Sequence, residues 1–229
     1  MRPKNLKRMS NQRKILLDQI VDRIYSIQKD GPLLVAVDGV DAAGKSYFAQ
    51  ALRDLLMMRE RPVILASVDD FHNPAAVRYV KGKDSPEGFY FDSYNYPLLQ
   101  EYLLNPFKKG QGFYKTVAYD CDNDCPVQCD VKEVSANDIL VMEGIFLQRP
   151  SLEAYWDLKL FLEVSFETTQ TRNIKRARDI ARIGTVDQIK DRYFKRYMPG
   201  QQLYFKEASP QRNADILIDN NDYNAPFVI

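Results

Sequence analysis

Eight residues near the start of the chain have the types and spacing needed to grip phosphates. Residues 39–46, GVDAAGKS, match the pattern G-x-x-x-x-G-K-[ST] at every fixed position. In this pattern backbone N–H groups approach phosphates closely, Lys45 offsets their charge, and the Ser46 hydroxyl can ligate Mg²⁺. The motif therefore predicts a nucleoside triphosphate site, whose contacts are expected from Gly39, Asp41, Ala42, Ala43, Gly44, Lys45, Ser46 and Tyr47.

The context of this loop supports the interpretation. An apolar run, LLVAV, ends just before it, and the dozen residues that follow it contain no Gly or Pro. A strand, the loop and a helix thus come in the required order, and the N-terminus of that helix adds a positive dipole end at the phosphates. A chance match in an ordinary turn is disfavoured.

Acidic residues follow two other apolar runs. Residues 62–68, PVILASV, have the composition of a buried strand and are followed by Asp69 and Asp70. A shorter run at 139–142 is closed by Glu143. Carboxylates at the end of a buried strand point to a functional site, although an Asp in this place can also simply cap the next helix.

Strand-like and helix-like segments alternate along the chain. A helical period predicts a lead-in helix at 10–28, and apolar runs predict five strands at 33–37, 62–68, 139–142, 158–164 and 215–218. Such alternation favours a parallel sheet covered on both faces. We expect an α/β three-layer sandwich with a mostly parallel five-stranded sheet, in a single domain over residues 1–229.

Two segments interrupt this alternation. Residues 70–95 are rich in Lys, Gly, Pro and aromatic side chains, and predict an irregular substrate-side insertion that precedes a helix at 96–104. β-type residues at 114–119 and 127–134 flank an Asp/Asn/Cys turn. Residues 112–135 are therefore expected to form a β-hairpin that projects from the main sheet.

A cation-rich segment precedes the last predicted strand. Residues 168–197 have a helical pattern and carry Arg172, Lys175, Arg176, Arg178 and Arg182. Such a run is ordinarily a solvated helix face. In a chain that binds a triphosphate, however, cations are needed around the γ-phosphate, and mobile arginine-bearing segments supply them. We predict an arginine-rich lid.

Overall composition excludes some partners. With 32 basic and 31 acidic residues the chain has no global field that marks a nucleic-acid binder or a membrane-surface protein. No apolar run approaches the ~20 residues of a membrane helix. We expect a soluble, cytoplasmic protein that acts on a small molecule without a nucleic acid polymer or a membrane as partner, and a homo-oligomer is compatible with the sequence.

The three cysteines do not indicate a metal site. Cys121, Cys125 and Cys129 are spaced by four, without a fourth thiol, and His72 is the single histidine of the chain. Zinc sites use a different spacing and a fuller ligand set. Free thiols near a hairpin turn are the preferred interpretation.

The motifs and their order resemble one family. The loop, the strand ending in VDDF, the strand ending in VMEGIF and the segment TRNIKRARDI are similar to the uridine kinase and phosphoribulokinase group of P-loop kinases. The resemblance extends to FYFD, VAYD and a late PGQQLYF…ADILIDN passage, so it covers most of residues 33–219. It implies the P-loop NTPase fold and a kinase that uses ATP and Mg²⁺.

The resemblance also implies roles beside the loop. The family's Asp after the second strand activates the substrate hydroxyl, which makes Asp69 the candidate; a carboxylate there can orient an alcohol for in-line attack. Glu143 resembles the acidic residue that helps hold Mg²⁺ through water beside Ser46. In the lid, Arg172 and Arg176 are implied as catalytic residues and Arg178 as an ATP contact.

For the acceptor, the resemblance implies a ribose and a base. Uridine kinases hold the ribose diol with the Asp of an F-D pair and with a lid arginine, which here correspond to Asp92 and Arg172. They frame the base with aromatic residues, for which Phe91 and Tyr119 are the matching candidates. Without the family, a turn Asp and ordinary core aromatics would account for these residues as well as the functional roles do.

The sequence departs from the pattern where the base is read. Cys121 and Asp124 stand where animal-type uridine-cytidine kinases have an aromatic residue and a base-reading histidine, so base recognition is not carried over, although Asp124 remains a substrate-binding candidate. His72 replaces a tyrosine and could either contact the substrate or pack. The lid is one residue shorter than usual, so Arg176 and Arg178 are aligned less firmly than Arg172.

Together these features predict transfer of the γ-phosphoryl group of ATP to a primary hydroxyl, with the 5′-hydroxyl of uridine or cytidine as the expected acceptor. Another small alcohol, such as pantothenate, nicotinamide riboside, glycerate or a sugar phosphate, is the alternative; Lys81 and Lys83 could serve an acidic acceptor. A non-catalytic nucleotide-binding regulatory protein is the alternative of another class, and the intact loop and strand-end carboxylates argue against it.

Overall fold

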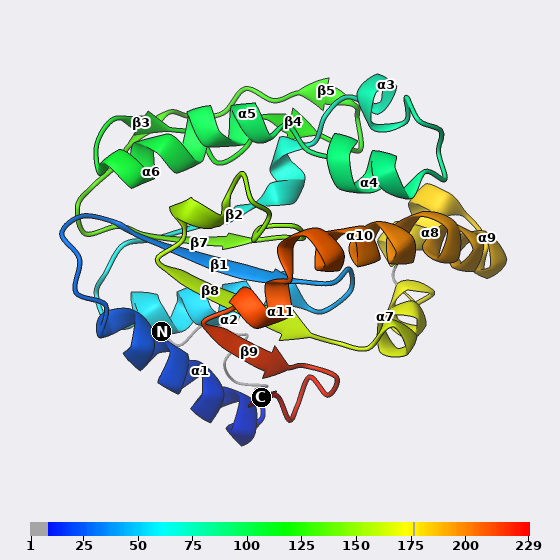
Figure 1. Ribbon diagram of the computed structural model, residues 1–229. Coiled ribbons are helices and arrows are strands. Elements are labelled where there is room, and N and C mark those ends of the chain that lie inside the picture. The colour runs from blue at the N-terminus through cyan, green and yellow to red at the C-terminus, as the bar shows by residue number, and fades with distance from the viewer. Residues whose placement is uncertain (1–8, 176) are drawn as a thin grey trace.

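A single six-stranded sheet forms the centre of the molecule (Figure 1). The computed structural model describes residues 9–175 and 177–229. All neighbouring strands pair in parallel except the two at one edge, which pair antiparallel. The strand order is β10 (Phe227–Val228), β9 (Ile216–Asp219), β8 (Leu158–Glu163), β1 (Leu33–Gly39), β7 (Ile139–Glu143) and β2 (Val63–Ser67).

The predicted α/β fold with a mostly parallel sheet is confirmed, with one strand more than the five expected. The additional strand, β10, has two residues and pairs with Asp219 and Ile218 of β9. A two-residue strand at an exposed edge has no room for a hydrophobic period, so the sequence carries no signal for it.

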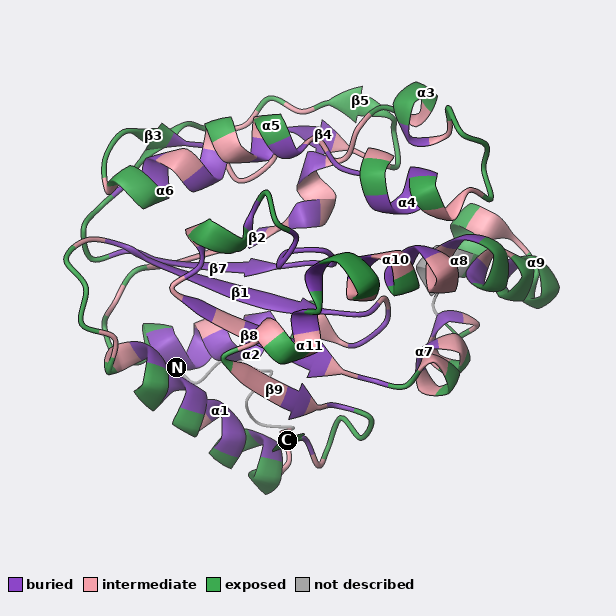
Figure 2. Ribbon diagram, in the orientation of Figure 1, coloured by how far each residue is buried: buried purple, intermediate pink, exposed green. Residues whose placement is uncertain are grey.

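Helices cover both faces of the sheet (Figure 1), and many of them are buried on one side and exposed on the other (Figure 2). Successive side chains of β1 point to opposite faces. Leu33, Val35 and Val37 pack with α1 (Asn11–Tyr25) and α2 (Lys45–Met57), whereas Leu34 and Ala36 belong to the core on the opposite face. β1 is buried along its whole length, as expected for a strand between two helical layers.

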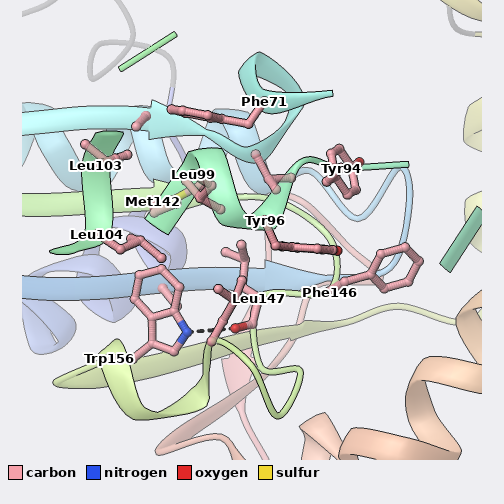
Figure 3. Packing of buried hydrophobic residues seen from close by; sticks show 14 of the residues in the cluster. Phe71, Tyr94, Tyr96, Leu99, Leu103, Leu104, Met142, Phe146, Leu147 and Trp156 are labelled. Atoms are coloured by element: carbon pink, nitrogen blue, oxygen red, sulfur yellow. Dashed lines mark hydrogen bonds between the residues drawn. The ribbon is translucent and has the colours of Figure 1, made fainter. Parts of the chain in front are cut away.

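The second core is rich in aromatic side chains (Figure 3). Phe71, Tyr94, Tyr96 and Phe146 pack around the end of the sheet, and the indole Nε1 of Trp156 donates to the carbonyl of Leu147 at 2.7 Å. The helices of this layer come mostly from the first predicted insertion and from the segment that follows it. They are α4 (Pro86–Asp92), α5 (Tyr96–Leu99), a π-helix (Gln100–Leu104), α6 (Asn105–Lys109), α10 (Met198–Ala208) and α11 (Pro210–Asn213).

The insertion expected to be a hairpin forms two small antiparallel sheets. β3 (Phe113–Tyr114) pairs with β6 (Lys132–Glu133), and β4 (Tyr119–Asp120) pairs with β5 (Cys125–Pro126). The first insertion contains the helix α3 (Ala75–Arg78) as well as α4. Both insertions lie along the same side of the sheet in Figure 1, above β2 and β7.

Consecutive helices occupy the cation-rich segment. They are α7 (Phe166–Asn173), α8 (Ala177–Ile183), α9 (Val186–Arg192) and a π-helix (Tyr193–Tyr197) that continues into α10. α9 begins at a capping box, in which the Thr185 hydroxyl accepts from Gln188 N and the Gln188 side chain accepts from Thr185 N. Within the described ranges, no helix is both long and apolar enough to cross a bilayer.

Candidate functional site

The carboxyl ends of three neighbouring strands meet at one edge of the sheet and define the site. Glu143, the last residue of β7, is in register with Val37 of β1 and with Ser67 of β2. The phosphate-binding loop follows β1, and Asp69 follows β2. Parallel pairing thus brings together residues that are up to a hundred positions apart, at the place where open α/β sheets bind ligands.

Only glycine fits at the end of the loop. Gly44 has φ +91° and caps the N-terminus of α2. A Cβ at this position would lie 2.5 Å from Cε1 of Tyr223, which comes from the C-terminal segment. Both the left-handed backbone and the close approach of Tyr223 require the absence of a side chain at Gly44. α2 begins at the next residue, so the free backbone amides of its N-terminus belong to the loop motif.

Oxygen ligands suited to a hard cation lie beside the loop. The Ser46 hydroxyl donates to Oε1 of Glu143 at 3.2 Å, and Nζ of Lys45 donates to the carbonyl of Val40 at 2.8 Å. Glu143 is 9% exposed; burial raises the pKa of its carboxyl, and the charge of Asp69 raises that pKa further. A hydroxyl and a carboxylate in this position fit Mg²⁺, which takes few protein ligands and several waters.

Asp69 lies in a short 3₁₀ turn (Val68–Phe71) that directly follows β2. The Tyr94 hydroxyl donates to Oδ1 of Asp69 at 3.0 Å, and the backbone N–H of Asp69 donates to the Ser67 hydroxyl at 3.2 Å. Ser67 is therefore the cap of this turn, so capping does not account for the Asp69 carboxylate. His72 Nδ1 donates to the carbonyl of Asp69 at 2.6 Å, and its ring packs against Tyr94.

Acidic groups crowd this edge of the sheet. Burial raises the pKa of Asp70 to about 6, with further increases from Asp69 and Glu143. Like charges in one partly buried region disfavour one another's ionised form. A nearby cation would relieve this repulsion, which is consistent with the Mg²⁺ ligands proposed from Ser46 and Glu143.

A cleft of about 1130 Å³ connects the loop with the two insertions and the lid segment. A smaller cavity of about 350 Å³ lies beneath the second insertion and shares Asp69 and His72 with the cleft. The predicted site residues that line the cleft are Asp41, Ala42, Gly44, Lys45, Ser46, Tyr47, Asp69, His72, Glu143 and Arg172. Tyr119 lines the smaller cavity.

Three acceptor candidates lie outside both linings. Asp92 pairs with Lys81 at 2.6 Å, and the exposed ring of Phe91 lies beneath that same lysine. Asp124 pairs with Arg78 at 3.0 Å and accepts from the backbone N–H of Ala75 at 2.8 Å. In this structure the side chains of these three residues make contacts within and between the insertions.

Arg172 joins the lid segment to the loop. Its guanidinium donates to the carbonyls of Ala42 at 3.3 Å and Asn221 at 2.8 Å, and its Cζ lies 3.7 Å from the centre of the Tyr223 ring. Arg176 lies outside the described residues, and so does the side chain of Arg178. The lid role of the segment remains a prediction.

The C-terminal segment contributes contacts that sequence reasoning missed. Asn220 Nδ2 donates to the carbonyl of Ala43 at 2.7 Å, and the Tyr223 hydroxyl donates to that of Ala42 at 3.3 Å. Gln201 of α10 accepts from the backbone N–H of Asp41 at 2.7 Å. The late PGQQLYF…ADILIDN passage was the available signal, but only the fold shows that it contacts the loop.

Several cleft residues were not singled out in the sequence. Arg78, Arg192 and Arg196 line the cleft. Arg182, one of the cations of the predicted lid, also lines it and pairs with Asp122 of the second insertion. They come from segments that were assigned to no motif or to a generally basic lid. Cys121 also lines the cleft and accepts from Arg78 Nη1 at 3.0 Å; no disulfide joins the three cysteines.

The sequence model of the phosphoribulokinase/uridine kinase family matches residues 34–225. This chain belongs to the phosphoribulokinase/uridine kinase family. The match spans the loop, both strand-end carboxylates, the lid segment and the C-terminal contacts. The protein is accordingly a P-loop kinase that transfers a phosphoryl group to an alcohol. No curated protein matched the chain in sequence.

Several solved kinase structures share the fold. A "Possible Uridine Kinase" from Bacillus stearothermophilus superposes with a TM-score of 0.70 at 22% identity, covering 89% of this chain and 97% of that one. D-glycerate 3-kinase from Cryptococcus neoformans gives 0.61 at 16% identity, covering 95% and 97%. Phosphoribulokinase from Rhodobacter spheroides gives 0.58 at 16%, covering 84% and 71%. At these identities the likeness establishes the fold alone.

Proposed function

We propose that this kinase transfers the γ-phosphoryl group of ATP to a primary hydroxyl positioned at Asp69. One observation carries the proposal: Asp69, Glu143 and the loop residues Lys45 and Ser46 all line the same cleft. Phosphoryl transfer depends mainly on positioning and charge stabilisation, and these residue types supply both.

Each residue has a role that follows from its place. Lys45 and the loop amides bind the β- and γ-phosphates, because they combine positive charge with backbone donors at a helix N-terminus. Ser46 and Glu143 would hold Mg²⁺, which supplies charge neutralisation at the phosphate oxygens. Asp69, oriented by the Tyr94 hydroxyl, accepts a hydrogen bond from the acceptor alcohol and takes up its proton during transfer. Arg172 steadies the loop carbonyls and adds positive charge at the donor end.

The identity of the acceptor is the open part of this proposal. The family resemblance suggests the 5′-hydroxyl of uridine or cytidine, which would place the protein in pyrimidine salvage in the cytoplasm. Asp92 and Phe91, on which a ribosyl acceptor depended, lie outside the cleft lining. The test therefore includes the alternative acceptors, glycerate and sugar phosphates among them, beside the nucleosides. One of the similar structures is a D-glycerate 3-kinase.

A coupled assay of ADP release tests the proposal. The purified protein is incubated with Mg-ATP and each of uridine, cytidine, pantothenate, nicotinamide riboside, glycerate and sugar phosphates. The Lys45→Met variant, which lacks the cation at the phosphates, provides the background rate. We expect at least one acceptor to release ADP well above that background. Binding of a non-hydrolysable ATP analogue without ADP release from any acceptor would instead favour a non-catalytic regulatory protein.

A further inference from the structure

Three arginines from separate elements line the acceptor side of the cleft. Arg78 ends α3, Arg192 ends α9, and Arg196 lies in the π-helix that follows. None belongs to the phosphate-binding loop. These three arginines are remote in sequence from the phosphate-binding loop. Binding of the ATP phosphates by that loop therefore does not explain why they are clustered.

Arg196 is the centre of this cluster. It is 3% exposed, and its guanidinium donates to the carbonyls of Ser85 at 3.0 Å and Arg78 at 3.4 Å. The rings of Tyr79 and Phe89 lie 5.1 and 5.6 Å from its Cζ. Among the residues that the structure describes, no carboxylate forms an ion pair with Arg196. A buried cation held only by carbonyl dipoles and aromatic faces has no counter-charge of its own.

The two neighbouring guanidinium groups make this deficit larger. Arg78, Arg192 and Arg196 line the same cleft, and Arg196 donates to the backbone carbonyl of Arg78. Burial lowers the pKa of Arg196, and the charges of Arg192 and Arg78 act in the same direction. Such mutual repulsion in a desolvated place is unfavourable unless an anion compensates it.

The carboxylates that pair with this cluster lie at its rim. Asp124 pairs with Arg78 and Asp84 pairs with Arg192, and their side chains are 44% and 54% exposed. Because the carboxylate partners are exposed to solvent, water and salt screen these pairs and weaken them. Arg78 is 8% exposed, and its Nε is a buried donor with no hydrogen-bond partner in the described part of the chain. The arginines around the cleft therefore have at least one buried N–H donor that no acceptor in the described part of the chain satisfies.

The cluster and the proposed reacting centre line the same cleft. Asp69, His72 and Arg78 are all among its lining residues, and His72 donates to the carbonyl of Asp69. Arg78 also contacts Cys121, which lines both the cleft and the smaller cavity beside Asp69. A molecule bound in this cleft is therefore surrounded by Asp69 as well as by the arginines.

We propose that the acceptor alcohol carries an anionic group, a carboxylate or a phosphate, and that Arg196, flanked by Arg78 and Arg192, binds this group while the hydroxyl lies at Asp69. The inference rests on the proposed kinase function and names the substrate class of the same site. The planar guanidinium fork matches both anions, and binding one there restores the missing counter-charge. A neutral nucleoside would leave the cluster uncompensated.

Matched acceptors test this charge requirement. ADP release with Mg-ATP is compared between glycerate and glycerol, pantothenate and panthenol, and fructose 6-phosphate and fructose, with uridine and cytidine as neutral nucleosides. We expect kcat/KM for an anionic member to exceed that of its neutral partner by about 10- to 100-fold. The first two pairs identify a carboxylate and the third identifies a phosphate. A nucleoside or neutral partner that is phosphorylated equally well or better would overturn the inference and leave the kinase function intact. Absence of ADP release from every acceptor would contradict the kinase function itself.

Variants locate the anion at the cluster. Arg196→Gln should raise KM for the anionic acceptor by about 10- to 100-fold and leave KM for ATP within about twofold, while Arg196→Lys, which keeps the charge without the fork, should lose less. Because Arg196 also holds backbone carbonyls, Arg192→Gln provides a second variant whose side chain lies nearer the rim. Lys195→Gln is the matched control, since this exposed lysine pairs with Asp191 outside the cleft lining. A rise in KM for ATP with an unchanged KM for the acceptor would assign the arginines to the donor phosphates and overturn the inference.

Discussion

The two ends of the cleft are built in different ways. At the proposed nucleotide end, consecutive residues of one loop supply the glycine turn, Lys45 and Ser46, and most of the proposed phosphate contacts come from the backbone. At the acceptor end, side chains such as His72, Cys121 and Arg196 come from separate insertions and from the lid segment. A site made by backbone geometry tolerates few substitutions, whereas a site made by side chains on insertions can change its ligand while the fold is kept. This difference explains why the donor is easier to infer than the acceptor.

The largest expected effect lies where the two ends meet. Asp69→Asn keeps the size of the side chain and removes the negative charge that orients the alcohol. We expect kcat to fall by about 10²- to 10⁴-fold with KM for ATP nearly unchanged, measured by steady-state ADP release. Asp70→Asn is the matched neighbour and should lose less than about tenfold. Equal losses in both variants would mean that the acidic group as a whole, and not Asp69, positions the hydroxyl.

A smaller effect is expected on the metal at the nucleotide end. Glu143→Gln removes the carboxylate that accepts from Ser46 but keeps a similar shape. The Mg²⁺ concentration for half-maximal rate should rise by about 10- to 100-fold, since partners of this kind commonly contribute that much to metal affinity. Titration of the rate with Mg²⁺ at saturating ATP measures this shift. Glu163→Gln, at the end of β8 outside the cleft lining, is the control. An unchanged Mg²⁺ requirement in Glu143→Gln would remove this residue from the metal site.

The C-terminal support of the loop should have a more modest effect. Tyr223→Leu removes the ring beneath Arg172 and the hydrogen bond to the Ala42 carbonyl. We expect KM for ATP to rise by about three- to tenfold while KM for the acceptor stays the same. Tyr223→Phe keeps the ring and should lose only part of this. An effect on the acceptor instead of ATP would contradict the division of the cleft into two ends.

The smallest effect concerns stability and depends on pH. Burial, with Asp69 and Glu143, raises the pKa of Asp70 from 3.8 to about 6. The folded protein therefore binds this proton more tightly than the unfolded chain does, so its contribution to stability is lost as pH rises through this range. Asp70→Asn removes that loss, and the free energy of unfolding at about pH 7.5 should exceed the wild-type value by about 1 kcal/mol, allowing for partial exposure. Urea denaturation at about pH 7.5 and pH 4 measures it. The gain should shrink at the lower pH, and an equal gain at both values would exclude the electrostatic cause.

How far the sequence predicted the molecule differs between its parts. The parallel sheet and its flanking helices follow from long apolar runs and helical periods, because burial on both faces leaves a strong pattern. The loop, Asp69 and Glu143 could be recognised because each lies at or just after the carboxyl end of a strand. For residues 112–135 the sequence predicted that strands pair there but not which residues pair. Strands of two residues are too short to leave a periodic pattern.

The acceptor end shows where such reasoning stops. Asp92 and Phe91 were candidates by resemblance, yet α4 places them outside the cleft lining, and Asp92 pairs with Lys81. Arg196 had no motif to mark it. Its part in the cleft arises because α4 and the π-helix before α10 pack together, which is a contact between segments about a hundred residues apart.

The sequence by itself was enough to predict the family, the sheet and the phosphate-binding loop. Each of these depends on a local pattern, either a periodic run of side chains or fixed residue types at fixed spacing. Only the tertiary structure decided which side chains line the proposed acceptor end of the cleft. Burial, pairing and the charge around Arg196 depend on neighbours that are remote in the chain, and no local pattern encodes them.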